Sequence, residues 1–373
     1  MSGPLAGLKV LEFAGIGPGP YGAMLMADLG ADILRIERAG SVRQDPEDDL
    51  LLRSRPSIAV DIKSGAGHEL ILELVERCDA VMEGFRPGVM ERLGLGPIEL
   101  LARNPRLVYG RMTGYGQSGP LSERAGHDIN YIAVSGALWP LGRAGERPVA
   151  PMNLVGDFGG GATFLVMGML AAIISSKSTG EGQVVDAAMV DGSASLLTMM
   201  HTFLNVGFWQ EERGVNILDS GAHFYDVYET SDQKYVAVGA VEAKFYGELL
   251  QGLGLESADL PAQMDRTQWP AMKEHFAVIF ATKTRDEWTA IFAEKDACVT
   301  PVLSPREAAR HPYNTERDVF ALEPVIQPNP APRFSKTPGS IGDVTLTDPA
   351  ESLRRWGLSD ERLESLRESG AFA

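Results

Sequence analysis

The stretch LKVLEFAGIGPGPYGAMLMADLGADILRIER, residues 8–38, decides the fold class. Residues 8–13 and 32–37 are apolar runs of strand length, and residues 21–29 between them have the composition of a helix. A strand, a helix and a second strand joined by short connections are typical of a βαβ unit with parallel strands. The opening of the chain therefore predicts an α/β fold with a Rossmann-like parallel sheet.

The loop within this stretch matches a nucleotide-binding pattern. GPGPYG, residues 17–22, satisfies G-x-G-x-x-G, and Glu37 stands at the acidic position expected after it. Such a loop offers backbone N–H groups and a helix N-terminus to a pyrophosphate, but Pro18 and Pro20 have no N–H to offer. The prolines argue against phosphate binding, and an NAD-dependent oxidoreductase stays open as an alternative.

The composition indicates a soluble enzyme without a disulfide framework or a metal cluster. The 373 residues are 44% apolar and 23% charged, which allows a large core and two domains. The formal net charge of -16 argues against nucleic acid and anionic membranes as partners, because both need a basic surface. The two cysteines, Cys78 and Cys298, are consistent with a reducing cytoplasm.

The pattern of predicted elements changes near residue 207. Before it, strands alternate with helices, which is typical of a parallel α/β sheet. The expected strands are residues 57–62, 80–82, 107–111 and 183–189, and the expected helices are 67–77, 129–136 and 193–206. After it, residues 223–229 and 234–241 predict a hairpin, followed by two short helices and a strand at 298–303. The second part is predicted to be a smaller α+β domain.

Three side chains are candidates for acid–base chemistry. His127 in GHDINY precedes a predicted helix that Asp128 can cap, although a histidine without a role would fit the same pattern. Asp157 in NLVGDFGGG can cap the apolar helix that follows, where free N–H groups would suit an oxyanion. Glu242 follows the second hairpin strand, and from the sequence alone a surface charge explains it better.

Four basic residues stand near the ends of predicted strands, where ligands of open α/β sheets bind. Such side chains can hold phosphates in an acidic protein, but arginines are more often simply solvated. They are Arg38, Lys63, Arg86 and Arg92.

Several separated motifs resemble CoA-transferase family III and, within it, the α-methylacyl-CoA racemases. They occur in the family's order along nearly the whole chain. They are the opening stretch, VDIKS, GFRPGVMERLGLG, GRMTGYGQSGP, GHDINYIA, GDFGGG and GEGQVVDAAMVDG.

The resemblance implies a reaction and its residues. These racemases interconvert R and S 2-methylacyl-CoA thioesters without cofactor or metal, with the family's histidine and aspartate matching His127 and Asp157. Glu242 matches the glutamate that supports the histidine, and Asn153 matches an asparagine before the aspartate. The residues that the resemblance implies for CoA binding are Arg38, Val60, Asp61, Ile62, Lys63, Gly84, Phe85, Arg86, Arg92, Gly126, Asp128, Ile129, Asn130 and Tyr131.

The resemblance also implies an architecture and a partner. The family forms an interlocked homodimer in which the last segment of each chain returns to the large domain. We therefore expect a large CoA-binding domain at residues 1–190, a linker at 191–222, a small domain at 223–320 and a returning segment at 321–373. The expected partners are an acyl-CoA thioester and a second copy of the chain, in the cytoplasm.

Two further alternatives remain beside the oxidoreductase. A true CoA-transferase would use Asp157 as a nucleophile that attacks the thioester and carries CoA covalently, whereas the histidine at position 127 favours the racemase. A catalytically silent acyl-CoA binder would show the same motifs. The loop at residues 15–21 is expected to line the acyl-thioester pocket, and residues 189–203 to select the acyl chain.

Overall fold

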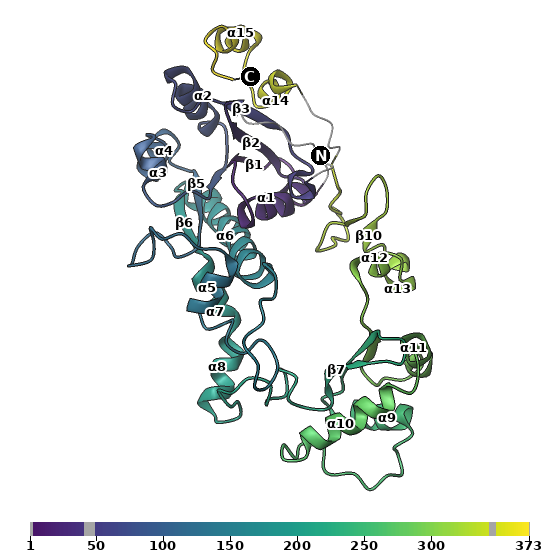
Figure 1. Ribbon diagram of the computed structural model, residues 1–373. Coiled ribbons are helices and arrows are strands. Elements are labelled where there is room, and N and C mark those ends of the chain that lie inside the picture. Colours follow the sequence, from purple (N-terminus) through teal and green to yellow (C-terminus); the bar gives the residue numbers. More distant parts are fainter. Residues whose placement is uncertain (1–2, 41–48, 343–347, 373) are drawn as a thin grey trace. The chain divides into compact units, whose positions relative to one another are not determined.

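The computed structural model describes residues 3–40, 49–342 and 348–372, and the chain divides into two units (Figure 1). The first unit contains residues 1–135, 152–196 and 318–373, and the second contains residues 136–151 and 197–317. The expected linker is thus divided at residue 196, and the second unit also takes in residues 136–151, which follow a helix of the large domain.

The first unit is built on the predicted parallel sheet, whose six strands lie in the order β3-β2-β1-β4-β5-β6. All five pairings are parallel, which confirms the α/β class. The chain proceeds outward from β1 to β3 in one direction and from β4 to β6 in the other, so the direction reverses between β1 and β4. The strands are β1 (Lys9–Phe13), β2 (Asp32–Arg38), β3 (Ser57–Val60), β4 (Ala80–Glu83), β5 (Val108–Thr113) and β6 (Gln183–Ala188).

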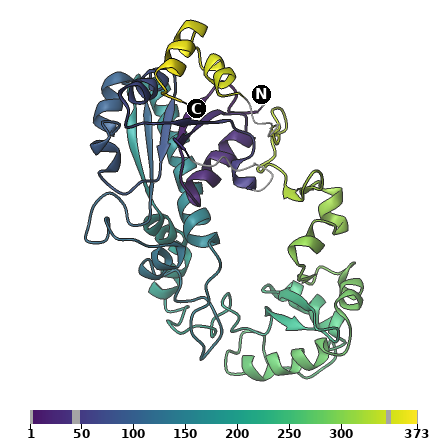
Figure 2. The ribbon, with the colours of Figure 1, turned by 45° about the horizontal axis from the view of Figure 1, so that its top comes forward.

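Helices cover both faces of this sheet (Figure 2). Successive strand residues point to opposite faces, so Leu11 packs in one apolar cluster and Val10 in the other. One face is covered by α1 (Pro18–Asp28) and α6 (Thr163–Thr179). The other face is covered by α2 (Gly65–Val75), α4 (Pro97–Arg103), α14 (Pro349–Arg355) and α15 (Asp360–Glu368).

Helix α1 begins three residues earlier than the sequence predicted, at Pro18. Pro18 and Pro20 therefore stand in the first helical turn, where the missing N–H groups would have had no partner within the helix. Tyr21 makes the first intrahelical bond, from its N–H to the carbonyl of Gly17 at 3.2 Å. The prolines start the helix as well as removing donors from the loop.

The remaining elements of the first unit are short, apart from a π-helical segment before α6. Together with α6 this segment forms a continuous helix, Leu154–Thr179, that is long and apolar enough to cross a membrane by length and composition alone. Its Leu165, Met169 and Ala172 face is buried in the core of this unit. The other elements are α3 (Val89–Arg92), α5 (Asp128–Val134), π-helix η2 (Leu154–Ala162), α7 (Met189–Leu196), 3-10 helix η1 (Leu50–Leu52), β10 (Phe320–Ala321) and β11 (Gln327–Pro328).

The C-terminal segment packs on the first unit. Trp356 is fully buried, and its indole N–H donates to Asp32 Oδ1 at 3.3 Å. Arg355 binds the same carboxylate oxygen at 2.8 Å. Leu363 and Leu366 of α15 lie in the same apolar cluster as strands β1–β3. Residues from both ends of the chain therefore build one core.

The second unit contains the predicted hairpin, β7 (Tyr225–Glu229) and β8 (Tyr235–Gly239), with β9 (Val299–Pro301) antiparallel to β8. Three helices pack around this sheet, α9 (Ala243–Leu253), α10 (Trp269–Phe280) and α11 (Arg285–Phe292), where the sequence predicted two. The predicted helix at residues 193–206 is interrupted at Leu197, and its second half is α8 (Thr198–Asn205). Two short helices follow, α12 (Pro305–Ala308) and α13 (Pro312–Glu316).

An aromatic core in this unit encloses His223, which is 1% exposed. Its Nε2 lies 2.9 Å from the Tyr246 hydroxyl, and its ring meets Phe224 and Phe276 edge to face. Burial lowers the pKa of His223 from 6.5 to about 4. The histidine is therefore neutral in the folded unit at neutral pH.

This burial predicts a pH-dependent stability. Below pH 6.5 the unfolded chain binds a proton that the folded unit binds only near pH 4. The free energy of unfolding should therefore fall by up to roughly 1.4 kcal/mol per pH unit as the pH drops through this window. Thermal unfolding of His223→Gln between pH 7 and 4.5 should show a shallower dependence than wild type, while exposed His275→Gln serves as control. Equal slopes for all three proteins would contradict this role.

Candidate active site

A cavity of about 500 Å³ opens at the edge of the sheet where β1, β4 and β5 end. The crevice beside a reversal of strand order is where open α/β sheets bind ligands. Three connecting loops and residues of α1, α5, η2 and α7 supply its walls. The lining residues include Gly15–Gly19, Gly84–Pro87, Gly114, Tyr115, Arg124, Gly126, His127, Tyr131, Asp157 and Met189.

His127 lies on the cavity wall directly before α5. It is the N-cap residue of this helix, and its backbone N–H donates to Asn130 Oδ1 at 3.1 Å. The Tyr131 hydroxyl donates to the carbonyl of Gly126, so the backbone on both sides of His127 is fixed by α5. The imidazole is exposed, and it is therefore available to a ligand in the cavity.

Asp157 lies on the same cavity and belongs to the π-helix η2. Asn153 Nδ2 donates to its Oδ2 at 3.2 Å. Burial raises the pKa of Asp157, and the charge of Asp128 adds to this rise, whereas Asn153 and His127 oppose it. A carboxyl with a raised pKa can both accept and donate a proton closer to neutral pH than an exposed aspartate.

The structure corrects the two predicted helix caps. Asp128 is the first residue of α5 rather than its cap, and its buried Oδ2 accepts the backbone N–H of Asp157 at 2.6 Å. Asp157 lies within η2, whose N-cap is Asn153, and the N–H of Phe158 donates to the Asn153 carbonyl at 3.3 Å. The N–H groups of Asp157 and Phe158 are thus occupied and do not face an oxyanion.

Glycines allow the loop after β1 and the π-helix to approach other groups closely. Gly17 has φ +68°, and a Cβ there would lie 3.1 Å from Asp157 Oδ2. A Cβ on Gly160 would lie 2.5 Å from the backbone nitrogen of Ser193 in α7. The absence of a side chain at Gly17 lets this loop lie against the Asp157 carboxylate. The absence of a side chain at Gly160 lets the backbone of η2 pack directly on the backbone of α7.

The residues implied for CoA binding lie along the same sheet edge in several places. Gly84, Phe85, Arg86, Gly126 and Tyr131 line the cavity itself. A second hollow of about 590 Å³ is lined by Ile62, Lys63 and Arg92. Arg38, Val60 and Asp61 lie at the ends of β2 and β3, and the Val60 side chain is buried in the core. Asp128, Ile129 and Asn130 form the first turn of α5.

Glu242 belongs to the second unit. It is exposed and is the N-cap residue of α9, although its side chain makes no capping hydrogen bond. Its pairing with His127 of the first unit stays a prediction.

Two buried carboxylates on the cavity wall, Glu12 and Glu83, were missed in the sequence. Burial raises the pKa of Glu83 to about 7, although the N–H of Phe85, at 2.6 Å, and Arg111, at 3.3 Å, oppose this shift. The sequence did carry a signal for both residues, because each is an acidic residue inside an otherwise apolar strand: Glu12 in LEF and Glu83 in VMEG. Such a charge is rarely buried without a partner or a task.

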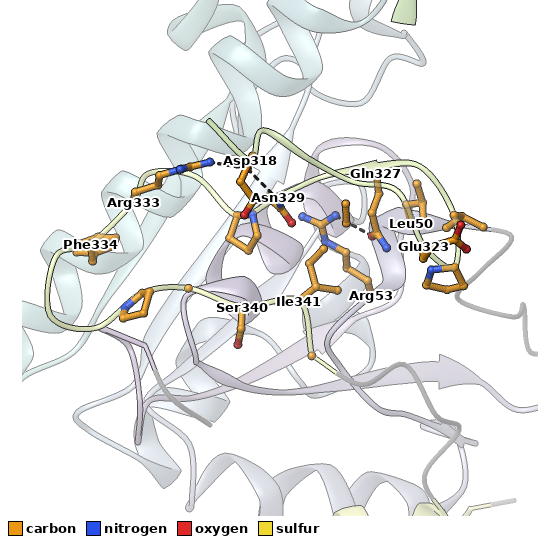
Figure 3. Close-up of a pocket in the computed structure, with 17 residues that line it drawn as sticks. Leu50, Arg53, Asp318, Glu323, Gln327, Asn329, Arg333, Phe334, Ser340 and Ile341 are labelled. Atoms are coloured by element: carbon orange, nitrogen blue, oxygen red, sulfur yellow. Dashed lines mark hydrogen bonds between the residues drawn. The ribbon is translucent and has the colours of Figure 1, made fainter. Parts of the chain in front are cut away.

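A larger cavity of about 860 Å³ lies elsewhere in the first unit, between residues 50–53 and the segment 318–342 (Figure 3). Both of its arginines already have partners within the protein. Arg53 pairs with the buried Asp28 at 2.5 Å and donates to Gln327 at 3.0 Å, and Arg333 donates to the carbonyl of Asp318. The smaller cavity, which holds His127 and Asp157, is therefore the better candidate for chemistry.

Comparisons with known proteins agree on a family and a fold. The model of CoA-transferase family III matches residues 5–349. The chain is 45% identical over 372 residues to an alpha-methylacyl-CoA racemase of Mus musculus and 44% identical to that of Homo sapiens, in both cases over 97% of this chain and 96% of the relative. A solved CaiB/BaiF family protein from Brucella suis, 24% identical, has a TM-score of 0.80 over 95% of this chain and 100% of that one, which supports the fold.

The contacts of Asp157 predict opposite pKa changes for two variants. Asn153→Ala removes a hydrogen bond that favours the charged carboxylate, so the pKa of Asp157 should rise further. Asp128→Asn removes a neighbouring negative charge, so the pKa should fall. A carboxyl ¹³C NMR titration would measure both values against wild type, and shifts of the same sign would contradict the geometry.

Proposed function

Because the chain belongs to CoA-transferase family III, we propose that it is a racemase that interconverts the R and S forms of 2-methylacyl-CoA thioesters. The observation that carries this proposal is that His127 and Asp157 line one cavity beside glycine-rich walls. The racemase relatives at 44–45% identity support the same reaction. We expect the enzyme to act in the cytoplasm and in lipid metabolism.

The proposed mechanism needs one acid–base group on each face of a planar enolate. One residue takes the α-proton from its face, and the conjugate acid of the other returns a proton to the opposite face. His127 and Asp157 fill these roles, and neither proton step requires a cofactor or a metal. Glu242 would hydrogen-bond His127 and stabilise the imidazolium.

The enolate oxygen needs hydrogen-bond donors that are in place before the reaction. The backbone from Asp157 to Gly160 was expected to supply them, but the N–H groups of Asp157 and Phe158 already donate to Asp128 and to the Asn153 carbonyl. We assign this role to the backbone N–H of Asp128. Asp128 is the first residue of α5, directly after His127, and an N–H at this position has no acceptor within the helix. The same buried residue then holds Asp157 through its carboxylate.

CoA would extend from this cavity along the sheet edge. Arg86 lines the cavity from the loop after β4, and Lys63 and Arg92 line the second hollow. Cations at these positions can hold the phosphates although the whole chain is acidic. Ile16, which is 83% exposed on the cavity loop, and Met189 would contact the acyl chain.

A homodimer is the proposed assembly. Helix α6 buries one apolar face in the core, yet its opposite face also carries apolar side chains, with Met167 59% and Ile174 71% exposed. A contiguous apolar face of this kind marks an interaction site. A second copy of the chain, as in the interlocked dimers of the family, would cover it.

The dimer predicts a mass change on substitution. Met167→Asp together with Ile174→Asp should place two charges in the subunit interface and shift the protein toward the monomer, as measured by light scattering. The same substitutions leave the face of α6 that is buried in the core untouched. A wild-type protein of monomer mass would refute the assembly.

Isotope exchange tests the proposed reaction. A single epimer of a 2-methylacyl-CoA incubated with the enzyme in D2O should take up deuterium at the α-carbon and invert, as followed by NMR. His127→Ala should slow inversion by about 10²- to 10⁴-fold and leave CoA affinity nearly unchanged. Absence of exchange in wild type would refute the racemase. Transfer of CoA to an added carboxylate, with hydroxylamine-sensitive labelling of Asp157, would instead identify the transferase.

A further inference from the structure

We propose that Glu12, with Arg35 and Arg55, positions the cavity loop against Asp157, where the cavity loop means residues 15–20, the end of the connection after β1 together with the first turn of α1. Losing Glu12 then impairs proton transfer by Asp157 and spares proton transfer by His127. The inference rests on the proposed racemase function and assigns a role to a buried charge cluster that the mechanism does not use. Glu12 is a positioning residue in this proposal, because it acts through the loop rather than on the substrate.

Glu12 is the centre of a buried ion network. It lies in β1, one residue before the strand ends, and is 1% exposed. Its Oε1 accepts from Arg35 Nη1 at 2.5 Å, and its Oε2 accepts from Arg55 Nε at 2.6 Å. Arg35 also binds Glu37 at 2.6 Å. One carboxylate therefore holds two guanidinium groups beneath the cavity.

The two arginines tie this carboxylate to both ends of the loop. Arg55 Nη2 donates to the carbonyl of Pro20 at 3.1 Å, and Arg35 Nη2 donates to the carbonyl of Gly15 at 3.4 Å. Both donors belong to guanidinium groups that Glu12 orients. Proline and glycine supply no side-chain hydrogen bonds, so these two carbonyl contacts are what join the segment to the ion network, beside the helical bond from the Tyr21 N–H to the Gly17 carbonyl.

The loop in turn touches the segment that carries Asp157. A Cβ on Gly17 would lie 3.1 Å from Asp157 Oδ2, and the ring of Tyr21 lies 4.4 Å from that of Phe158. His127, in contrast, is held by contacts within the α5 segment, through Asn130 and Tyr131. A displacement of the loop therefore reaches Asp157 before it reaches His127.

Removing the charge of Glu12 should release this arrangement. Glu12→Gln keeps the shape and one acceptor oxygen, but it leaves Arg35 and Arg55 without their buried anion. A misplacement of about 1 Å can reduce catalysis by about 100-fold. The effect should fall on the epimer whose α-proton Asp157 removes.

The experiment measures α-deuteration of each 2-methylacyl-CoA epimer separately in D2O. Asp157→Asn first identifies the epimer that depends on Asp157. Glu12→Gln should slow deuteration of that epimer by at least about tenfold, with the other epimer within about twofold of wild type. Arg55→Lys, which retains the charge but loses the fork that reaches Pro20, should show the same selectivity and covers the case in which Glu12→Gln fails to fold.

A matched control is Asp28→Asn. Asp28 is an equally buried carboxylate, 2% exposed, that pairs with Arg53 at 2.5 Å at the far end of α1. It should affect both epimers alike. Equal slowing of both epimers by Glu12→Gln or by Arg55→Lys, or no slowing by either, would overturn the positioning role. Absence of exchange in wild type would refute the racemase function itself, which is a separate outcome.

Discussion

The reversal of strand order between β1 and β4 is the constraint on which the rest of this structure depends. The chain continues from β1 toward β2 on one side and from β4 toward β5 on the other. The loops that follow β1 and β4 therefore diverge and leave a crevice at the carboxyl ends of these two strands. The loop after β1 and the GFRPG loop after β4 form its two sides. His127, directly before α5, and Asp157, in η2, both line this crevice.

Buried carboxylates hold the walls of that opening in place. Asp128 fixes the backbone of Asp157, Glu12 orients two arginines beneath the first loop, and Glu83 accepts the N–H of Phe85 in the second. Each has hydrogen-bond partners within the protein, as a buried charge must. The proposed acid–base pair, His127 and Asp157, therefore lies beside buried charged groups that are held by arginines and by backbone N–H groups.

The fold could be predicted because it rests on local patterns, whereas the meeting of His127 and Asp157 at one cavity followed from the resemblance to the family. Strand periodicity and the short loops of residues 8–38 were sufficient for the parallel sheet, and the glycines around Asp157 pointed to a close approach. The helix starts could not be predicted, because a capping pattern does not reveal a competing tertiary acceptor. Asp128 satisfies the Asp157 N–H across 29 residues, and the π-helix begins before the aspartate instead of at it. The roles of Glu12 and Glu83 depend on arginines from other strands, and spacing along the chain does not show such pairs.

The return of the C-terminal segment to the first unit bears on biosynthesis. Trp356, Leu363 and Leu366 close the apolar face over β1–β3, yet the ribosome makes them only after the entire second unit. The second unit has its own core and can fold while this sheet face is still open. A nascent or truncated chain lacking the last 25 or so residues would expose a strip of core to solvent. The final helices therefore act as a closing step, and translation that stops short of them leaves a product suited to aggregation and proteolysis rather than to catalysis.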